Sequence, residues 1–529
     1  MNTIHKLLLA LPFGLLALLA CGQGAWAGQN NTDALRIDSG PISGTADGDM
    51  RTYLGIPYAA PPVGALRWRP PQPVAAWKDV RPCTEFGPAC PQPRQNPNGN
   101  YSEDCLTLNV WTSAKKPGAR LPVMVWIHGG AFNFGASSLP EYHGANLARR
   151  GVVVVTLNYR LGPLGFLVHP ALNGESARGV SGNYGLLDQI AALKWVRSNI
   201  AAFGGAPGNV TIFGQSAGSR SVSLQLLSPL SKGLFARAIA QSGGPIIGSE
   251  YLSPDFKGDM AAVSRMGQEL AKRLGCADAS DAIAAMRTKS AEEVVAAAAC
   301  STSVFETGLF FAPVFDGAVL PKDPAVTFLA GRQHRVPVIT GSTRNEGTLY
   351  LKDEKELTLA RYEAFLRARF GLETPAALAM FPAKDDDAVR AAIDRVISVG
   401  ANAQPARFVA RMAAKAGRKA FLYQFTRVPG TMMARQLGAF HGVDLAYMFG
   451  NMAEADGYNA MDVELSRQMM TYWVNFAKTG DPNGPGLPVW PTQKSETHME
   501  FGDTVRTGTG LYRDACDFIE AQWGRSLKQ

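Results

Sequence analysis

Short runs of apolar residues alternate along the chain with longer amphipathic stretches. The runs at 122–127, 152–158, 210–213, 236–240, 336–340 and 420–425 are rich in Val, Ile, Leu and Phe, and helical patterns separate them. Continuous apolar runs of this length are typical of strands that are buried on both faces of a parallel sheet. The pattern therefore predicts an α/β architecture, with one large, mostly parallel sheet that is covered by helices on both faces.

The run at 210–213 continues directly into Gly-Gln-Ser-Ala-Gly at 214–218, and a helical pattern follows to Leu227. A serine on a sharp strand-to-helix turn needs glycine neighbours, because the backbone there is strained and crowded. The N-terminus of the helix also directs free N–H groups toward the serine oxygen. We therefore predict that Ser216 is a nucleophile.

A second glycine-rich segment, His-Gly-Gly-Ala-Phe at 128–132, follows the strand predicted at 122–127. Small residues let main-chain N–H groups turn toward a substrate carbonyl without a side chain in the way. Alone, the segment would equally be an ordinary turn after a strand. Next to a nucleophilic serine, we expect it to form one half of an oxyanion hole, with the N–H of Ala217 as the other half.

A nucleophilic serine needs a base, and His441 is the candidate among seven histidines. It precedes a glycine in a predicted loop, ahead of the apolar segment 445–449. His128 belongs to the glycine-rich loop, and His5 belongs to the N-terminal leader. The remaining histidines lie beside charged, proline or polar residues, and we expect them to be solvated on surface loops: His143, His169, His334 and His498.

Glu346 is the candidate acid that orients this base. It follows the apolar run at 336–340 and directly precedes a glycine. A loop glutamate taken alone is more often simply solvated. The chain order Ser216, Glu346, His441 is nevertheless that of the α/β-hydrolase fold, and it differs from the orders in chymotrypsin and subtilisin.

Together these motifs resemble the type B carboxylesterases, a family that also contains cholinesterases, fungal lipases and the inactive neuroligins. The resemblance runs from about residue 53 to about 501 and rests on Tyr-Leu-Gly-Ile-Pro-Tyr-Ala at 53–59, Ser-Glu-Asp-Cys-Leu-Thr-Leu-Asn-Val at 102–110, Gly-Asn-Tyr-Gly at 182–185 and Ala-Lys-Thr-Gly-Asp-Pro-Asn at 477–483. It implies the α/β-hydrolase fold and these roles: Ser216 as nucleophile, Glu346 as acid, His441 as base, and the N–H groups of Gly130, Ala131 and Ala217 as the oxyanion hole.

Two residues depart from the family pattern. Gln215 stands where the family usually has glutamate, so a negative charge beside the serine is missing. Ala131 replaces the third glycine of the oxyanion loop, and its N–H is still available. We expect Phe132, Asn133 and Gln215 to line the substrate pocket.

The predicted strands form one continuous series, so we expect a single domain at 28–529, although length alone would favour three or more domains. Two stretches, from about 250 to 310 and from 353 to 415, have Ala, Arg, Lys and Glu at helical spacing. We interpret them as helical insertions over the active site.

The N-terminus predicts export. Lys6 precedes an apolar run of 14 residues at 7–20, which is short for a bilayer span but suits a signal-peptide core. Ala-Trp-Ala at 25–27 supplies a small-x-small cleavage site, so we predict a signal peptide at 1–27 and a periplasmic or secreted protein. The alternative is a lipid anchor at Cys21, because Leu-Leu-Ala-Cys at 18–21 resembles a lipoprotein box.

Six cysteines remain after Cys21, and six cysteines allow 15 connectivities. The family resemblance implies a disulfide between Cys90 and Cys105, and Cys276 with Cys300 is the candidate second pair. Elimination leaves Cys83 and Cys516 as the third pair; the alternative is that some of the six cysteines are free buried thiols.

The net charge of the chain does not change the predicted function. The formal net charge is +8, and it falls to +7 without residues 1–27, which hold one lysine and no acidic residue. The positive residues are scattered rather than clustered with aromatics, which argues against a nucleic-acid partner. The mechanism requires no metal or organic cofactor, and the sequence shows no closely spaced metal-ligand set.

We therefore predict a serine carboxylesterase that cleaves small to medium carboxylic esters through an acyl-enzyme on Ser216. One alternative is a lipase that acts on longer-chain acylglycerols, although no large apolar lid is evident. The other is a non-catalytic binding relative, against which the complete triad argues.

Overall fold

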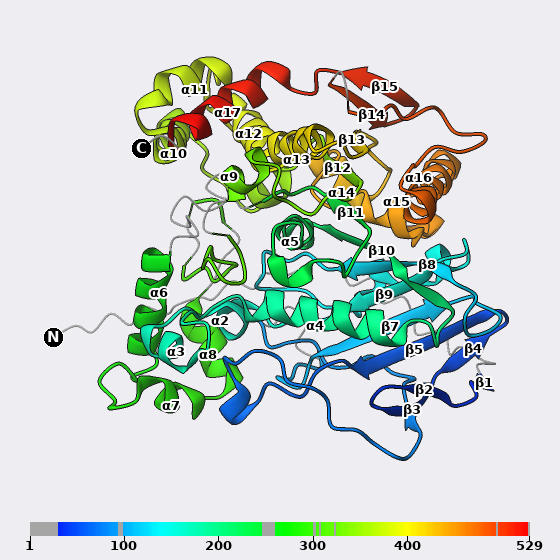
Figure 1. Cartoon of the computed structure of the whole chain (residues 1–529). Coiled ribbons are helices and arrows are strands. Elements are labelled where there is room, and N and C mark those ends of the chain that lie inside the picture. Colours follow the sequence, from blue (N-terminus) through cyan, green and yellow to red (C-terminus); the bar gives the residue numbers. More distant parts are fainter. Residues whose placement is uncertain are drawn as a thin grey trace.

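A large sheet forms the centre of the molecule (Figure 1). The structure is a computed structural model, and it describes residues 30–93, 99–245, 260–299, 303–305, 308–321, 324–493 and 496–526. Neighbouring strands from β9 to β14 run parallel, and the strands outside them pair antiparallel. In sheet order, the described strands are β1 (Asn30–Asn31), β4 (Thr45–Asp47), β5 (Met50–Pro57), β7 (Thr107–Thr112), β9 (Val153–Leu157), β8 (Leu121–Ile127), β10 (Gly205–Gln215), β11 (Arg237–Gln241), β12 (Val338–Thr343), β13 (Ala420–Phe425), β14 (Thr497–Phe501) and β15 (Val505–Thr509).

Each of the six predicted apolar runs is a strand of the parallel part of this sheet. Successive side chains of a strand point to opposite faces, and the core divides accordingly. On β8, Val123 and Val125 pack into one hydrophobic cluster, while Met124 and Trp126 pack into another. The sheet is therefore buried on both faces, which confirms the predicted α/β architecture.

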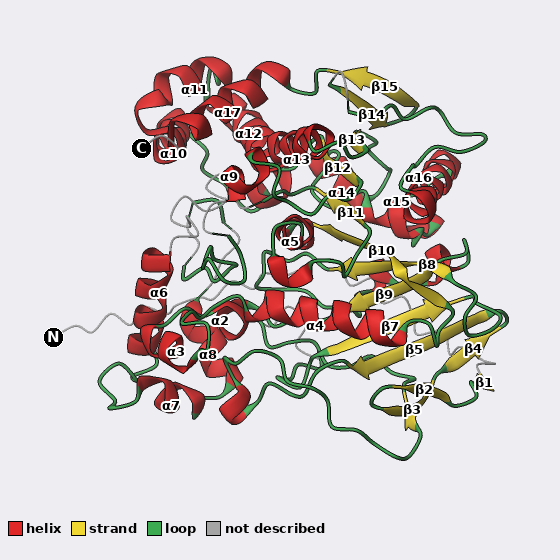
Figure 2. Cartoon of the chain, viewed as in Figure 1, coloured by secondary structure: helices red, strands yellow, loops and turns green. Residues whose placement is uncertain are grey.

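Helices cover both faces, and Figure 2 shows the strands stacked from β1 near the bottom to β15 near the top. One cluster contains side chains of α4, α5 and α13, and the other contains side chains of α1, α15 and α16. The described helices of four or more residues are α1 (Ala145–Ala148), α2 (Gly162–Phe166), α3 (Pro170–Glu175), α4 (Tyr184–Asn199), α5 (Ala217–Gln225), α6 (Met260–Arg273), α7 (Ala282–Arg287), α8 (Ala291–Ala298), α9 (Pro324–Leu329), α10 (Leu359–Phe370), α11 (Thr374–Met380), α12 (Asp386–Ile397), α13 (Gln404–Lys415), α14 (Met432–Leu437), α15 (Leu445–Phe449), α16 (Ala460–Thr479) and α17 (Arg513–Ser526), together with the short η5 (Thr348–Leu351) and a π-helical segment, η7 (Ser398–Ala403).

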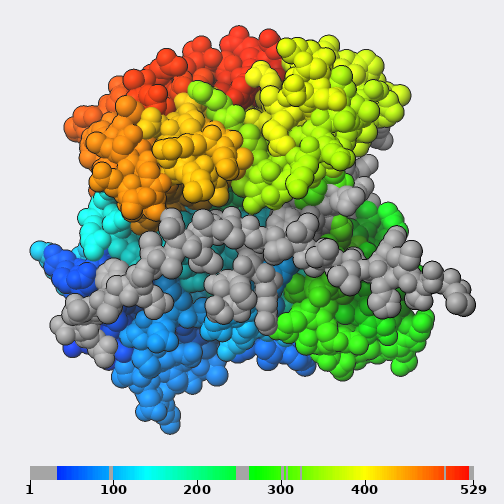
Figure 3. All heavy atoms as spheres, turned by 180° about the vertical axis from the view of Figure 1, so that it is seen from behind, coloured from blue at the N-terminus to red at the C-terminus, as the bar shows by residue number. Residues whose placement is uncertain are grey.

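The two stretches predicted as insertions are helical: α6 to α8 lie in the first, and α10 to α13 lie in the second. The second is only partly an insertion, because α13 packs on β12 and β13 and so belongs to the layer that covers the sheet. From behind, residues after about 350 form one side of the molecule and the N-terminal strands lie on the opposite side (Figure 3).

Cys90 and Cys105 form a disulfide, as the resemblance implied. Cys83 and Cys516 do not pair: each is a buried free thiol, Cys83 beside β3 and Cys516 on α17. Elimination failed here because burial in an apolar core is an equally good environment for a free thiol. Cys276 is also a buried free thiol, and its predicted partner Cys300 lies outside the described residues.

The predicted signal peptide and Cys21 likewise lie outside the described residues. In the described part of the chain, no helix is long and apolar enough to cross a membrane. A small second sheet is formed by β2 (Leu35–Ile37), β3 (Gly40–Ser43) and β6 (Arg81–Pro82).

Candidate active site

Ser216 lies at the junction between β10 and α5, with backbone angles φ 60° and ψ −124°. This positive φ is unfavourable for a residue with a side chain, so the fold must hold it in place. The Ser216 N–H donates to the backbone oxygen of Gln241 on β11 at 2.9 Å. A Cβ at Gly214 would lie only 2.6 Å from Gly218, and a Cβ at Gly218 would overlap the backbone of Ile127. Both glycines are therefore required by close approach.

The glycine-rich loop after β8 lies beside this serine. A Cβ on Gly129 would come within 3.1 Å of the Ser216 Cβ, which shows how closely the two segments approach. Gly130 and Ala131 have φ of 106° and 53°. Within the described residues, their N–H groups and that of Ala217 donate no backbone or side-chain hydrogen bond. Three unused donors next to a serine are what an oxyanion hole requires.

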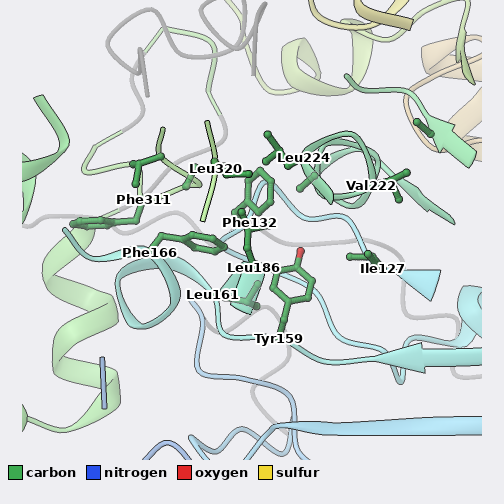
Figure 4. Close-up of a cluster of buried hydrophobic side chains, with 14 of the residues drawn as sticks. Ile127, Phe132, Tyr159, Leu161, Phe166, Leu186, Val222, Leu224, Phe311 and Leu320 are labelled. Atoms are coloured by element: carbon green, nitrogen blue, oxygen red, sulfur yellow. The ribbon is translucent and has the colours of Figure 1, made fainter. Parts of the chain in front are cut away.

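Phe132 and Asn133, which we expect to line the substrate pocket, are both buried and make contacts behind the glycine-rich loop. Phe132 is 2% exposed and packs edge-to-face on Phe166 within a hydrophobic cluster (Figure 4). The Asn133 amide donates to the backbone oxygens of Ala131 at 2.7 Å and Phe311 at 3.3 Å. These contacts fix the shape of the oxyanion loop from behind.

His128, at the start of the same loop, is fully buried and stacks on Tyr159 with ring centroids 4.5 Å apart. Its Nδ1 lies 2.7 Å from the backbone oxygen of Gly129. Burial lowers the pKa of His128 to about 4, so the ring is neutral near pH 7. Its contribution is therefore packing and loop geometry.

Glu346 and His441 come from different loops that are joined side by side. An isolated parallel bridge pairs Asn345 with Phe440, and the Asn345 N–H donates to the backbone oxygen of Ala439 at 2.9 Å. This pairing brings the Glu346 carboxylate against the His441 ring, where Nδ1 donates to Oε2. The carboxylate is fully buried.

Further polar contacts hold this carboxylate from behind. Its Oε1 accepts the Thr343 N–H at 2.6 Å, and the Glu346 N–H donates to Ser398 Oγ at 2.9 Å. Ser398 opens the π-helical segment, and its hydroxyl donates to Asp394 at 3.0 Å. Asp394 also accepts the Gly347 N–H, while burial raises the pKa of Asp394.

The outer nitrogen of His441 contacts Gln215. Since Nδ1 donates to Glu346, Nε2 is an acceptor, and the Gln215 amide nitrogen lies 3.1 Å from it. Among the described residues, no hydrogen bond joins Ser216 Oγ to His441. Tyr350 also lies beside the imidazole, with its ring centroid 5.5 Å from that of His441. Catalytic contacts are often long in ligand-free structures and shorten when substrate binds.

The remaining histidines are not the solvated surface residues expected from their neighbours in sequence. His169 and His498 are buried, and His498 lies on β14. His143 and His334 are half-buried. Burial lowers the pKa of all four. Local polarity misled here because the fold can bury a histidine among polar neighbours, on a strand as at His498 or at a helix N-cap as at His169.

Several residues of the site escaped the sequence reasoning. Tyr350, Asp394 and Ser398 lie in helical or loop segments with no motif of their own, and only the fold brings them to the triad. In the parts of the chain that the structure describes, no group of three or more His, Cys, Asp and Glu side chains is arranged to hold a metal ion.

Comparison with known proteins relates this geometry to one family. A family model described as the Carboxylesterase family matches residues 31–519. The chain is 38% identical over 493 residues to the fumonisin B1 esterase of Sphingopyxis macrogoltabida, covering 89% of this chain and 87% of that protein. It is 36% identical over 475 residues to the para-nitrobenzyl esterase of Bacillus subtilis (strain 168), covering 87% and 92%.

A mammalian protein and a solved structure extend the comparison. Liver carboxylesterase 1 of Oryctolagus cuniculus is 34% identical over 527 residues, with 90% of each chain covered. A solved PNB esterase superposes with a TM-score of 0.78 at 33% identity, covering 91% of this chain and 99% of that one.

Proposed function

The chain belongs to the carboxylesterase family and is a carboxylic ester hydrolase, and we propose that it acts through Ser216 as nucleophile, His441 as base and Glu346 as acid. The observation that carries this assignment is the buried Glu346–His441 contact beside a serine that the fold holds at positive φ. Strained backbone conformations cluster at functional sites, where the position of a side chain matters.

In this mechanism, His441 takes the Ser216 proton while Oγ attacks the ester carbonyl carbon. The carbonyl oxygen becomes an oxyanion that accepts from the N–H groups of Gly130, Ala131 and Ala217. Removal of one such donor typically costs about 3 kcal/mol of transition-state stabilisation. Glu346 keeps the imidazole in the tautomer that presents Nε2 to the serine and stabilises the imidazolium.

His441 then gives the proton to the departing alcohol, and the acyl group remains on Ser216 Oγ. Water repeats the attack with His441 as base, and the carboxylic acid leaves as the serine regains its proton. Before the first step, His441 Nε2 must exchange Gln215 for Ser216.

We infer that the natural substrates are small to medium esters. The named relatives comprise a fumonisin B1 esterase, a para-nitrobenzyl esterase and a liver carboxylesterase, all of which their names class as esterases. We also propose that the protein is exported through a signal peptide at 1–27. The Cys90–Cys105 disulfide supports export, because disulfides persist in oxidising compartments.

The test is hydrolysis of p-nitrophenyl esters of increasing acyl length by the wild type and by Ser216→Ala. We expect the highest activity on short chains and a loss of at least about 10⁴-fold in the variant. Ser223→Ala is the matched control, since Ser223 is a buried serine of α5 whose hydroxyl has no hydrogen-bond partner among the described residues.

Activity that rises only with long, emulsified esters would instead indicate a lipase. Equal rates for Ser216→Ala and the wild type would refute the assignment of the nucleophile.

A further inference from the structure

A second buried carboxyl group, which the proposed mechanism does not use, lies beneath the triad. Asp444 follows His441 by three residues, is fully buried, and directly precedes α15. Its Oδ2 accepts the Gln241 amide at 3.1 Å and the Tyr423 hydroxyl at 3.0 Å. Its Oδ1 has no hydrogen-bond partner among the described residues. A buried carboxyl group that is only half satisfied is costly and calls for an explanation.

Gln241 connects this carboxyl group to the nucleophile. Its side chain is held at both ends, since its amide nitrogen donates to Asp444 and its amide oxygen accepts from Trp473 Nε1 at 3.2 Å. Its backbone oxygen is the acceptor of the Ser216 N–H at 2.9 Å. The residue whose backbone oxygen accepts from the strained serine is therefore anchored through its side chain by Asp444 and Trp473.

Charged and titratable groups surround Asp444 from several elements. Glu346 approaches from the loop after β12, Tyr423 from β13, and His441 from the loop that also carries Asp444. Burial, and then the negative charge of Glu346, raise the pKa of Asp444 to about 6, although Gln241, Tyr423 and His441 favour its ionised form. The carboxyl group is therefore protonated more readily than that of an exposed aspartate.

We propose that Asp444 is a positioning residue of this active site: through Gln241 it holds Ser216 in the reactive backbone geometry, and its negative charge supports the imidazolium form of His441. The proposal rests on the assignment of Ser216, Glu346 and His441 as the triad. Ionised Asp444 is the active form, so the acid limb of the activity profile includes the protonation of two groups.

Two substitutions separate the charge from the contacts. Asp444→Asn keeps an oxygen for Gln241 and Tyr423 but removes the charge, whereas Asp444→Ala removes both. The measurement is kcat and KM for p-nitrophenyl butyrate from pH 5 to 9, with the concentration of active sites titrated by an organophosphate. Asp316→Asn is the matched control, because Asp316 is a buried carboxyl group that accepts backbone N–H groups of residues 318–320 and contacts neither Gln241 nor the triad.

We expect Asp444→Asn to lower kcat about tenfold at pH 8 with KM changed less than twofold. The slope of log kcat/KM on the acid side should fall from near 2 in the wild type to near 1. Asp444→Ala should lose at least a further tenfold in kcat, because Gln241 is released. Asp316→Asn should leave kcat per titrated active site, KM and their dependence on pH unchanged.

Wild-type kcat and an unchanged acid slope in Asp444→Asn would overturn the role of the charge. If both Asp444 variants lowered only the thermal midpoint and left kcat per titrated site intact, the residue would be structural and the proposal would fail. The failure of the triad assignment is distinguishable, because Ser216→Ala would then remain active whatever the Asp444 variants do.

Discussion

The imidazole of His441 has two neighbours of different chemical kind: a carboxylate at Nδ1 and a neutral amide at Nε2. Glutamate at position 215, the usual family residue, would place a second negative charge beside the ring. With Gln215, the carboxylate of Glu346 is the one negative charge of these two neighbours. The difference between an amide and a carboxylate at position 215 therefore changes the charge beside the imidazole.

Gln215→Glu is therefore expected to move the acid limb of kcat/KM to higher pH by about one unit, because an opposite charge within about 4–6 Å favours the protonated imidazole. Protonated His441 cannot act as base, so activity at pH 6 should fall relative to the wild type, while activity at pH 9 changes little. Gln72→Glu adds the same charge at an exposed site and is the control. An acid limb at the same pH in Gln215→Glu and wild type would contradict the contact.

Ala131 offers a second test at the residue scale, because its φ of 53° is unfavourable for a residue with a Cβ. Ala131→Gly should raise the free energy of unfolding by about 1 kcal/mol, as relief of the left-handed strain exceeds the added chain entropy. Activity should stay within about twofold, since the N–H is unchanged. Ala191→Gly, in the middle of α4, should instead destabilise by about 1 kcal/mol. The measurement is the free energy of unfolding of the wild type, Ala131→Gly and Ala191→Gly by chemical denaturation.

The buried parallel strands could be predicted from the sequence, whereas the short strands at the two edges of the main sheet could not. Runs such as 122–127 and 420–425 are continuously apolar because both of their faces pack against helices, and their bounds agree with β8 and β13 within one residue. Strand β10 extends further back, to Gly205, because its polar first half pairs with β8 across a register shift. Short antiparallel strands such as β1 and β15 lack an apolar run, so no pattern marks them.

Loops carry the site, and their placement depends on the sheet. Ser216 was predictable because glycines crowd its turn, and Glu346 because chain order alone selected it. Asp394, Ser398 and Asp444 could not be predicted, because their role depends on which loops the fold brings together. Phe132 and Asn133 were assigned to the pocket from their sequence position, and the structure shows both side chains buried beside the backbone turn at 130–132.

The Cys90–Cys105 disulfide joins two cysteines that are 15 residues apart, in the segment between β6 and β7. A loop of this length corresponds to about 3 kcal/mol of stabilisation in the chain-entropy model. The double variant Cys90→Ser/Cys105→Ser should therefore lower the free energy of unfolding by about that amount in urea. Reductant should destabilise the wild type but leave the double variant unchanged. Equal sensitivity of both proteins to reductant would show that the stabilisation comes from elsewhere.

At the scale of the whole molecule, the described chain is organised around one twelve-stranded sheet with an apolar core on each face. Residues before 30 lie outside the described residues, so the export prediction depends on the sequence of the N-terminus and on the Cys90–Cys105 disulfide. The net charge would become +7 after cleavage, with no basic stripe to suggest a nucleic-acid partner.

Export predicts a mature chain that begins at Gly28. Expression of the full-length gene product in a Gram-negative bacterium, followed by N-terminal sequencing of the periplasmic fraction, should give Gly-Gln-Asn-Asn. Ala27→Arg should block cleavage and serves as the control. Recovery in the membrane fraction, with a blocked N-terminus at Cys21, would instead establish the lipid anchor.

An organophosphate that mimics the acylation transition state shows whether Ser216 is the residue that carries the acyl group. The wild type, Ser223→Ala and Ser216→Ala are each incubated with diethyl p-nitrophenyl phosphate and examined by intact mass and peptide mapping. We expect one diethylphosphoryl group per chain on Ser216 in the first two proteins and none in the third, with loss of activity in proportion to labelling. Labelling of another residue, or inactivation of Ser216→Ala at the wild-type rate, would refute Ser216 as the nucleophile.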